Sequence, residues 1–377
     1  MGSYAPPAAP SPIDGLTHAD ALEEAHREVP DRPWGRIAVV ALVMTALLMG
    51  GWEELWRQQG FQAGDIKNGA AAWAAQRRRA EGDATVLIGS SRNLFDVDLD
   101  VWQKATGVRP VQLSLEGTSP RFVLADLAKD PKFHGLVVAD VVTDQFFGEF
   151  AGRGGAALGY FKNETPSQRV GRLLSILPED VFAYIDDETR PKNLWAELPL
   201  PLPLRKGQRP YLHVYKIGVS EADRNSRIWD RELTDKAYRE RSIRTWRIIS
   251  MPRPGDPKPN IPKVISEVAA NVAKIRARGG DAVFVKHPLS GVYAELESRY
   301  YPRRKFWDVL LTGTHTVGIN YEDHPELRGF RMPEQSHLDP RDAKTYTGRL
   351  AALVENSRRI GATRGNISLT PAAVGPN

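Results

Sequence analysis

The chain of 377 residues contains no cysteine, which excludes a disulfide-stapled mini-protein, a cysteine zinc site and a thiol nucleophile. Charge of one sign is not in large excess, with 51 Lys and Arg against 46 Asp and Glu. Nucleic acid is therefore not indicated as a partner. The lack of cysteine permits an oxidising compartment without requiring one. The composition is that of a globular protein with enough apolar residues for one or two ordinary cores, and it excludes a coiled-coil rod.

Long hydrophobic runs are absent apart from one near the N-terminus. Residues 37–52 read IAVVALVMTALLMGGW without a charge, and such a run is a membrane-span candidate at the short end of the range. Trp34, Trp52 and Trp56 lie at its ends, as aromatic residues do at membrane interfaces. A buried core helix is the alternative. We expect a transmembrane signal anchor over residues 34–56.

The segments around this run predict its orientation. Residues 1–33 are rich in Pro, Ala and acidic residues, so we expect a disordered tail. The flanking basic residues are Arg27, Arg32 and Arg36 before the run and Arg57 and Lys67 after it. The slight excess before the run predicts a cytoplasmic N-terminus. The expected protein crosses the inner (cytoplasmic) membrane once and has an extracytoplasmic C-terminal domain.

Beyond the run, short apolar segments alternate with segments of helix length. Residues 57–80 are Ala-rich and predict a juxtamembrane helix. Runs that are nearly continuous in apolar character, as central strands of a parallel sheet are, lie at 85–88, 111–115, 136–142 and 282–285. Segments of helix length lie at 94–106, 119–130 and 262–278. This alternation predicts a doubly wound α/β domain with a mostly parallel sheet over 81–360, followed by a flexible tail over 361–377.

Residues 151–260 interrupt the alternation. They contain the glycine-rich stretch AGRGGAALG, an expected helix near 166–177 and the run LPLPLPL at 198–204. Because the sheet pattern resumes afterwards, a separate domain is the less favoured interpretation. We expect a long insertion at one edge of the sheet that forms a cap or a partner surface.

A serine pair follows the first expected strand. Residues 86–92 read VLIGSSR, so Gly89, Ser90 and Ser91 lead from a strand into a helix at the carboxyl edge of the sheet, where open α/β folds bind ligands. At the helix start, backbone N–H groups near Ser91 can stabilise an oxyanion. A tight turn with a helix cap needs the same residue types, so a purely structural turn is the alternative.

A histidine and an acid occur together near the C-terminus. Residues 334–343 read EQSHLDPRDA and precede an expected helix at 345–354. Glu334 stands three residues before His337, so its carboxylate can fix the tautomer of the imidazole and leave the other ring nitrogen free to act as a base. A structural or surface histidine is the alternative.

Together these blocks resemble the SGNH or GDSL-type hydrolase superfamily over roughly half of the chain, in residues 80–145 and 262–355. GSS stands where the family has Gly-Asp-Ser, and EQSHLDPRDA stands where it has Asp-x-x-His-Leu-x-Pro-x-Gly. The resemblance implies that Ser91 is a nucleophile, His337 a general base and Glu334 the acid that orients it.

The resemblance also implies an oxyanion hole, and here the sequence departs from the family. Backbone N–H groups of Ser91 and Gly117 would form the hole, but the family's Gly-x-Asn-Asp block is missing. Thr143 or Asp144, in VVTDQFF, is expected in its place. Ser90 replaces the family aspartate, and a glutamate stands in the acid position. The residues expected to line the site are Ser90, Arg92, Asp144, Lys286 and His287.

The chain as a whole resembles membrane-anchored SGNH-like proteins of bacterial envelopes, among them D-alanyl transfer and exopolysaccharide-acetylating proteins. The shared features are one span, a serine block, a long insertion and a late histidine. The resemblance implies an O-acyltransferase or esterase that acts on an envelope polysaccharide through an acyl-serine, without a cofactor. The lipid bilayer and a multi-span O-acyltransferase are the implied partners. A non-catalytic scaffold in polysaccharide synthesis or export is the alternative, and the missing asparagine favours it.

The histidines and one basic, aromatic segment are the remaining candidates for binding sites. The spacings of His287, His315, His324 and His337 match no metal-ligand motif, so we expect no metal site. The segment around 299–305 mixes cations with aromatic residues. It predicts either a solvated face or a groove for carbohydrate or an anionic polymer.

Overall fold

The computed structural model describes residues 30–148, 152–190, 193, 214–251 and 258–367. The chain divides into two units, Met1–Trp52 and Glu53–Asn377. The described part of the first unit consists mainly of α2 (Trp34–Gln58), whose last residues belong to the second unit. Most of the expected N-terminal tail, the run LPLPLPL and the last ten residues lie outside the described residues.

The helix α2 contains the apolar run and is long and apolar enough to cross a membrane. No residue of α2 is buried; Leu42 and Leu47, for example, are 71% and 70% exposed. A core helix of a soluble protein would instead be mostly buried. One N-terminal helix is therefore able to span a membrane, while the type of membrane and the orientation stay predictions.

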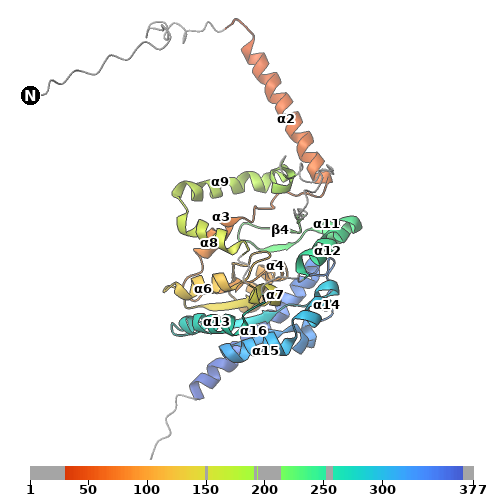
Figure 1. Cartoon of the computed structure of the whole chain (residues 1–377). Coiled ribbons are helices and arrows are strands. Elements are labelled where there is room, and N and C mark those ends of the chain that lie inside the picture. Colours follow the sequence, from red (N-terminus) through yellow and green to blue (C-terminus); the bar gives the residue numbers. More distant parts are fainter. Residues whose placement is uncertain (1–29, 149–151, 191–192, 194–213, 252–257, 368–377) are drawn as a thin grey trace, which may run out of the picture. The chain divides into compact units, whose positions relative to one another are not determined.

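A five-stranded sheet lies at the centre of the second unit (Figure 1). Its order is β2-β1-β3-β6-β7, and all four pairings are parallel. The strands are β1 (Thr85–Ile88), β2 (Val111–Gln112), β3 (Leu136–Asp140), β6 (Asp281–Lys286) and β7 (Val317–Asn320). The expected α/β class with a parallel central sheet is confirmed.

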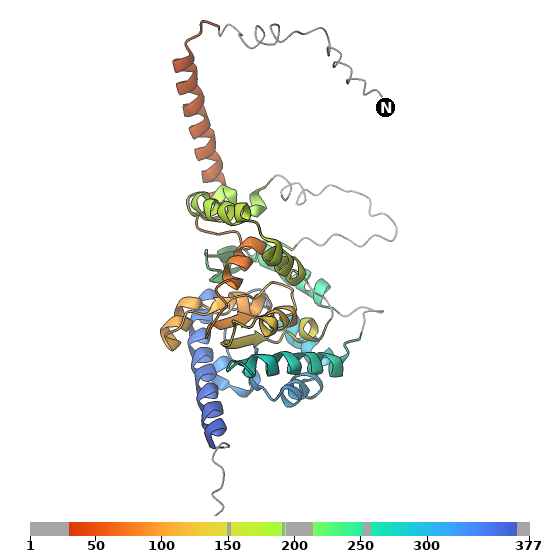
Figure 2. The same ribbon diagram turned by 90° about the vertical axis from the view of Figure 1, so that its left-hand side faces the viewer.

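Helices connect these strands and cover the sheet. They are α3 (Ala70–Arg77), α4 (Ser91–Phe95), α5 (Leu99–Thr106), α6 (Arg121–Lys129), α7 (Thr143–Phe147), α13 (Ile261–Arg276), α14 (Gly291–Tyr300), α15 (Arg303–Thr314) and α16 (Pro340–Ile367). Short 3-10 turns, η3 (Tyr321–Asp323) and η4 (Pro325–Leu327), follow β7. Figure 2 shows α13 in teal and α16 in dark blue on separate sides of the sheet.

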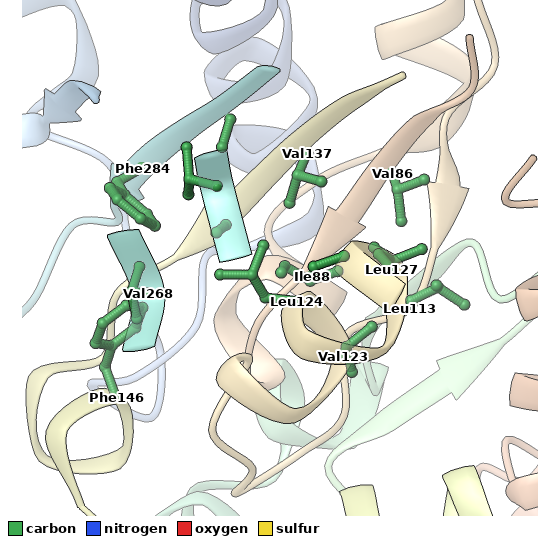
Figure 3. Close-up of a cluster of buried hydrophobic side chains, with 14 of the residues drawn as sticks. Val86, Ile88, Leu113, Val123, Leu124, Leu127, Val137, Phe146, Val268 and Phe284 are labelled. Atoms are coloured by element: carbon green, nitrogen blue, oxygen red, sulfur yellow. The ribbon is translucent and has the colours of Figure 1, made fainter. Parts of the chain in front are cut away.

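Successive strand residues contribute to two different cores, because side chains alternate across a sheet. In β1, Val86 and Ile88 belong to a cluster that also contains Leu124 of α6 and Val268 of α13 (Figure 3). Leu87 belongs to a second cluster, with residues of α5 and α16. Burial on both faces explains why the strand sequences are continuously apolar and do not alternate with polar residues.

The long insertion runs between β3 and β6. It contains α8 (Gly154–Asn163), α9 (Pro166–Val181), η1 (Ala183–Ile185), η2 (Asp187–Thr189), β4 (Gly218–Ser220), β5 (Ser226–Ile228), α11 (Asp230–Thr234) and α12 (Lys236–Ser250). The strands β4 and β5 form a separate antiparallel pair. Since β3 and β6 are neighbours inside the sheet, the insertion leaves from an inner strand and not from an edge strand.

Two expected helices differ from the structure. The segment 94–106 is divided between α4 and α5, because the Asp98 side chain accepts a hydrogen bond from Val101 N (2.9 Å) and caps a new helix. The expected juxtamembrane helix over 57–80 is also interrupted. The helix α2 ends before Gly60 and Gly64, which have φ values of 91° and 83°, a conformation that ends helices.

Candidate active site

The serine block occupies a tight turn at the carboxyl edge of the sheet. β1 ends at Ile88, and α4 begins at Ser91. Gly89 between them lies so close to β3 that an added Cβ would stand 2.5 Å from Asp140 Cβ. The turn therefore requires glycine at this position, and it brings the end of β1 against the end of β3.

The two serines of the block have different surroundings. The buried Ser90 hydroxyl donates to Asp140 Oδ2 (2.8 Å) and accepts from Arg92 N (3.4 Å), so it caps α4. Ser91 is the first residue of α4 and is partly exposed. Ser91 is therefore the more accessible serine of the pair, while the Ser90 hydroxyl stabilises the turn and faces Asp140.

Three side chains form a continuous hydrogen-bonded chain. The Ser91 Oγ lies 2.8 Å from His337 Nε2, and His337 Nδ1 lies 2.7 Å from Glu334 Oε1. The same carboxylate oxygen accepts a bond from the backbone N–H of His337 (2.8 Å). The contacts expected from the sequence are present, in the order of a nucleophile, a base and an orienting acid.

The insertion contributes to this arrangement through α12. Trp246 Nε1 donates to Glu334 Oε2 at 2.5 Å, so both carboxylate oxygens are bonded. The His337 ring meets Phe95 and Trp246 edge to face, with ring centroids 5.2 and 6.3 Å away. Glu334 and His337 are 0% and 1% exposed. Packing and hydrogen bonds thus fix the imidazole in one orientation.

The charges around His337 favour its protonated form. Burial alone would lower the pKa of the imidazole, but the carboxylates of Glu334 and Asp96 more than offset it, and the pKa of His337 is raised. Burial raises the pKa of Asp96 to about 7. Burial likewise raises the pKa of Glu232, from α11, to about 7. Two carboxyl groups whose pKa is raised to about 7 therefore lie within electrostatic reach of the His337 imidazole.

Arg92 is a buried cation beside the serine. Its side chain is 5% exposed, its guanidinium lies 4.7 Å from the ring centroid of Tyr293, and within the described residues its Nε has no hydrogen-bond partner. Burial raises the pKa of Asp144, and the charge of Arg92 partly opposes that effect. Arg92 and Asp144 therefore lie within electrostatic reach of each other, and their expected place in the site lining stays a prediction.

Two other expected site residues have structural partners. Lys286, at the end of β6, and the Thr143 hydroxyl, at the start of α7, each lie 2.5 Å from Glu297 Oε1. Neither of these groups is free to act on a substrate in this arrangement. The expectation that Thr143 or Asp144 takes the place of the family's oxyanion asparagine stays a prediction, as does the role of Gly117, which has a φ of 61° in the loop after β2.

His287 lies on the opposite side of β6 from Lys286, against α16. Its Nδ1 is 2.9 Å from the Tyr346 hydroxyl, and burial lowers the pKa of His287 to about 4. Within the described residues the buried Nε2 of His287 has no hydrogen-bond partner, and the place of this imidazole in the site lining stays a prediction. In the part of the chain that the structure describes, no three His, Asp or Glu side chains are grouped as metal ligands.

Part of the basic and aromatic segment at 299–305 is held by ion pairs and next to the core. Arg303 is bonded to Asp323 (2.6 and 2.7 Å) and Asp308 (3.2 Å). The neighbouring Phe306 and Trp307 are buried in the first core cluster. Tyr300, by contrast, is 39% exposed, and the Arg299 guanidinium lies 5.3 Å from its ring centroid. Binding of carbohydrate or an anionic polymer by this segment therefore stays a prediction.

Sequence reasoning missed three residues that contact the serine turn, the acid and the histidine. Asp140, Trp246 and Phe95 contact Ser90, Glu334 and His337, respectively. Of the three, only Asp140 is marked in the sequence, because it is an acidic residue within the apolar run 136–142. No known family model matches this sequence, and no curated protein matches it. The geometry of the site therefore carries the functional argument.

Proposed function

We propose that this chain is a serine-dependent acyltransferase or esterase with an SGNH-like domain. The observation that supports this most strongly is the hydrogen-bonded chain Ser91–His337–Glu334. It places a general base beside a hydroxyl and a carboxylate behind the base, which is how serine nucleophiles are activated. Ser91 is partly exposed while Glu334 and His337 are buried, so the nucleophile is the member of the triad that a substrate can reach.

In the proposed reaction, the Ser91 Oγ attacks an acyl carbonyl carbon while His337 Nε2 takes the hydroxyl proton. Glu334 stabilises the imidazolium that forms. The proton then passes to the leaving alkoxide, and an acyl-serine ester remains. A sugar hydroxyl, or water, then gives its proton to Nε2 and attacks the ester carbonyl. The bond to Ser91 Oγ breaks, and Nε2 returns the proton to that oxygen, which restores the free serine. Transfer to a sugar is acyl transfer, and transfer to water is hydrolysis.

The proposed substrate is an envelope carbohydrate, reached by an extracytoplasmic domain that α2 anchors in the inner membrane. The family resemblance and the apolar α2 support this part of the proposal. In this proposal a membrane-embedded acyltransferase supplies the acyl group. The anchor α2 then has a clear use, because holding the domain in the same membrane raises the effective concentration of Ser91 near the acyl donor.

Labelling of the full chain with a serine-reactive fluorophosphonate tests the proposal. We expect Ser91→Ala to abolish labelling and Ser90→Ala to retain it, since the Ser90 hydroxyl faces Asp140 and not the imidazole. Equal labelling of the Ser91→Ala protein would refute the assignment. A wild-type protein that is never labelled but still binds polysaccharide-synthesis partners would support the scaffold function instead.

A further inference from the structure

The helix α9 exposes its apolar side. Its large exposed apolar residues are Val170, Leu173, Leu174, Leu177 and Val181, which are 53–67% exposed. They recur at intervals of three and four residues and so form one continuous stripe along the helix. Helices on the surface of a soluble domain turn such a stripe toward the core, so α9 has the reverse arrangement.

The face of α9 that packs against the protein is polar. Arg172 and Glu179 are each 9% exposed, and their side chains pair at 3.4 Å. The second Glu179 contact is with the backbone N–H of Lys67, which donates to Oε2 at 2.8 Å. Gly64 N donates to the Glu179 carbonyl at 2.9 Å. The helix is therefore held in place by ionic and backbone contacts, and the described residues leave its apolar side uncovered.

The C-terminal end of α9 is fixed to the residues that follow the apolar run of α2. The carboxylate of Glu53, the first charged residue after that run, accepts hydrogen bonds from Ala183 N (2.9 Å) and Tyr184 N (3.1 Å). Arg57 Nη2 donates to the Val181 carbonyl at 3.2 Å. If α2 spans a membrane, Glu53 lies at the boundary between lipid and water, and the end of α9 lies there with it.

We propose that the apolar stripe of α9 inserts into the interfacial layer of the lipid bilayer that α2 crosses. The proposal rests on α2 being a membrane span, and it does not depend on the activity of Ser91. Lipid is the favoured occupant because contacts within the second unit fix α9 to the residue at which the span leaves the bilayer. A helix with one apolar face and a polar opposite face is suited to lie in the plane of an interface.

Depth measurements on the full chain test this proposal, and the absence of native cysteine means that one introduced cysteine reports one position. A nitrobenzoxadiazole fluorophore on Leu173→Cys or Leu177→Cys reports the depth of the stripe in the bilayer. Leu47→Cys examines the middle of α2. Ala270→Cys, exposed on α13, is the matched control in water. The proteins are reconstituted in phosphatidylcholine–phosphatidylglycerol vesicles with lipids that carry a nitroxide at a shallow or a deep position.

We expect shallow nitroxide lipids to quench the labels at 173 and 177 several-fold more than the label at 270, and deep nitroxide lipids to quench the label at 47 most. Quenching at 47 with no more quenching at 173 and 177 than at 270 would overturn the proposal while leaving the span intact. Labels at 173 and 177 that are shielded from aqueous iodide but not quenched by the lipids would overturn it in favour of a protein partner or a second copy. An unquenched label at 47 would remove its premise.

Discussion

At the scale of single residues, Glu334 Oε1 makes two hydrogen bonds with His337. These two bonds govern both the position and the charge of the proposed base. One bond is to the ring Nδ1 and the other is to the backbone N–H of the same residue. Rotation of the imidazole away from Ser91 would break the bond to the ring, and the bond to the backbone N–H keeps the loop beside the same carboxylate. The nearby carboxylates also raise the pKa of His337 above its usual 6.5.

This raised pKa predicts the pH dependence of acylation. A general base must be neutral, so the rate of fluorophosphonate labelling should fall as pH decreases through a midpoint above 6.5. Glu334→Gln removes a charge that raises the pKa, so the midpoint should move to lower pH. The maximal rate should also drop, on the order of 10⁴-fold by comparison with other Ser-His-acid sites.

Glu334→Asp is the control, because it keeps the negative charge and should leave the midpoint close to that of the wild type. A Glu334→Gln protein with an unchanged midpoint would show that Glu334 does not set the pKa of the base.

The triad could be predicted from the sequence because its parts lie in two short blocks. Glu334 and His337 are three residues apart on one loop, and the Gly-Ser-Ser turn directly follows an apolar strand. The supporting residues could not be predicted in this way. Trp246 is 88 residues from Glu334, and Asp140 is 50 residues from Ser90. Residues that are so far apart in the sequence form no local motif, so their contacts cannot be recognised before the fold is known.

At the scale of elements, the turn after β1 depends on the absence of a side chain at Gly89. Gly89→Ala would place Cβ 2.5 Å from Asp140 Cβ, so β1 and β3 would have to move apart. We expect a loss of about 1–3 kcal/mol in the free energy of unfolding, as for other overpacked sites. Chemical denaturation of the full chain in detergent measures this loss.

Gly155→Ala is the matched control for that change. Gly155 lies in α8, and an added Cβ there meets nothing within 4 Å. Since alanine favours helix over glycine, this variant should be as stable as the wild type or more stable, by up to about 1 kcal/mol. Similar losses in both variants would contradict the steric argument.

The insertion reaches the site through α12, and Trp246→Phe tests that link. Phenylalanine keeps an aromatic ring beside His337 but removes the N–H that bonds Glu334. A hydrogen bond to a charged group contributes about 1.5–3 kcal/mol, so we expect labelling of Ser91 to slow by about tenfold or more. Because the buried Glu334 loses a donor, the thermal unfolding temperature should also fall. A labelling rate equal to the wild type would show that α12 does not support the acid.

The central strands could be predicted because burial on both faces makes them continuously apolar. β7 could not, because Val317–Asn320 reads VGIN and is partly exposed at the edge of the sheet. β2 is shorter than its apolar run, since only Val111 and Gln112 pair with β1. The small pair β4 and β5 contains Gly, Ser and Arg and has no strand-like pattern. Edge and surface strands depend on tertiary contacts more than on their own sequences.

At the scale of the whole molecule, the proposed transfer reaction predicts a preference among acyl acceptors. The full chain in detergent should hydrolyse small acyl esters slowly and consume them faster when an oligosaccharide is added, because the sugar hydroxyl competes with water for the acyl-serine. Mass spectrometry of the glycan should show one added acyl group per transfer. Rapid ester hydrolysis with no gain from any glycan would indicate a plain esterase.

The reversed helix α9 has a practical consequence for preparing this protein. Removing residues 1–52 would delete the apolar run and still leave Leu173, Leu174 and Leu177 exposed to water. A shortened protein of this kind should self-associate at the concentrations used for crystallisation, unless detergent is kept or these leucines are replaced by polar residues. Cutting later, near residue 60, would also remove Glu53 and leave the N–H groups of Ala183 and Tyr184 without their acceptor. The better starting point for a soluble form is therefore Glu53, with the surface of α9 redesigned.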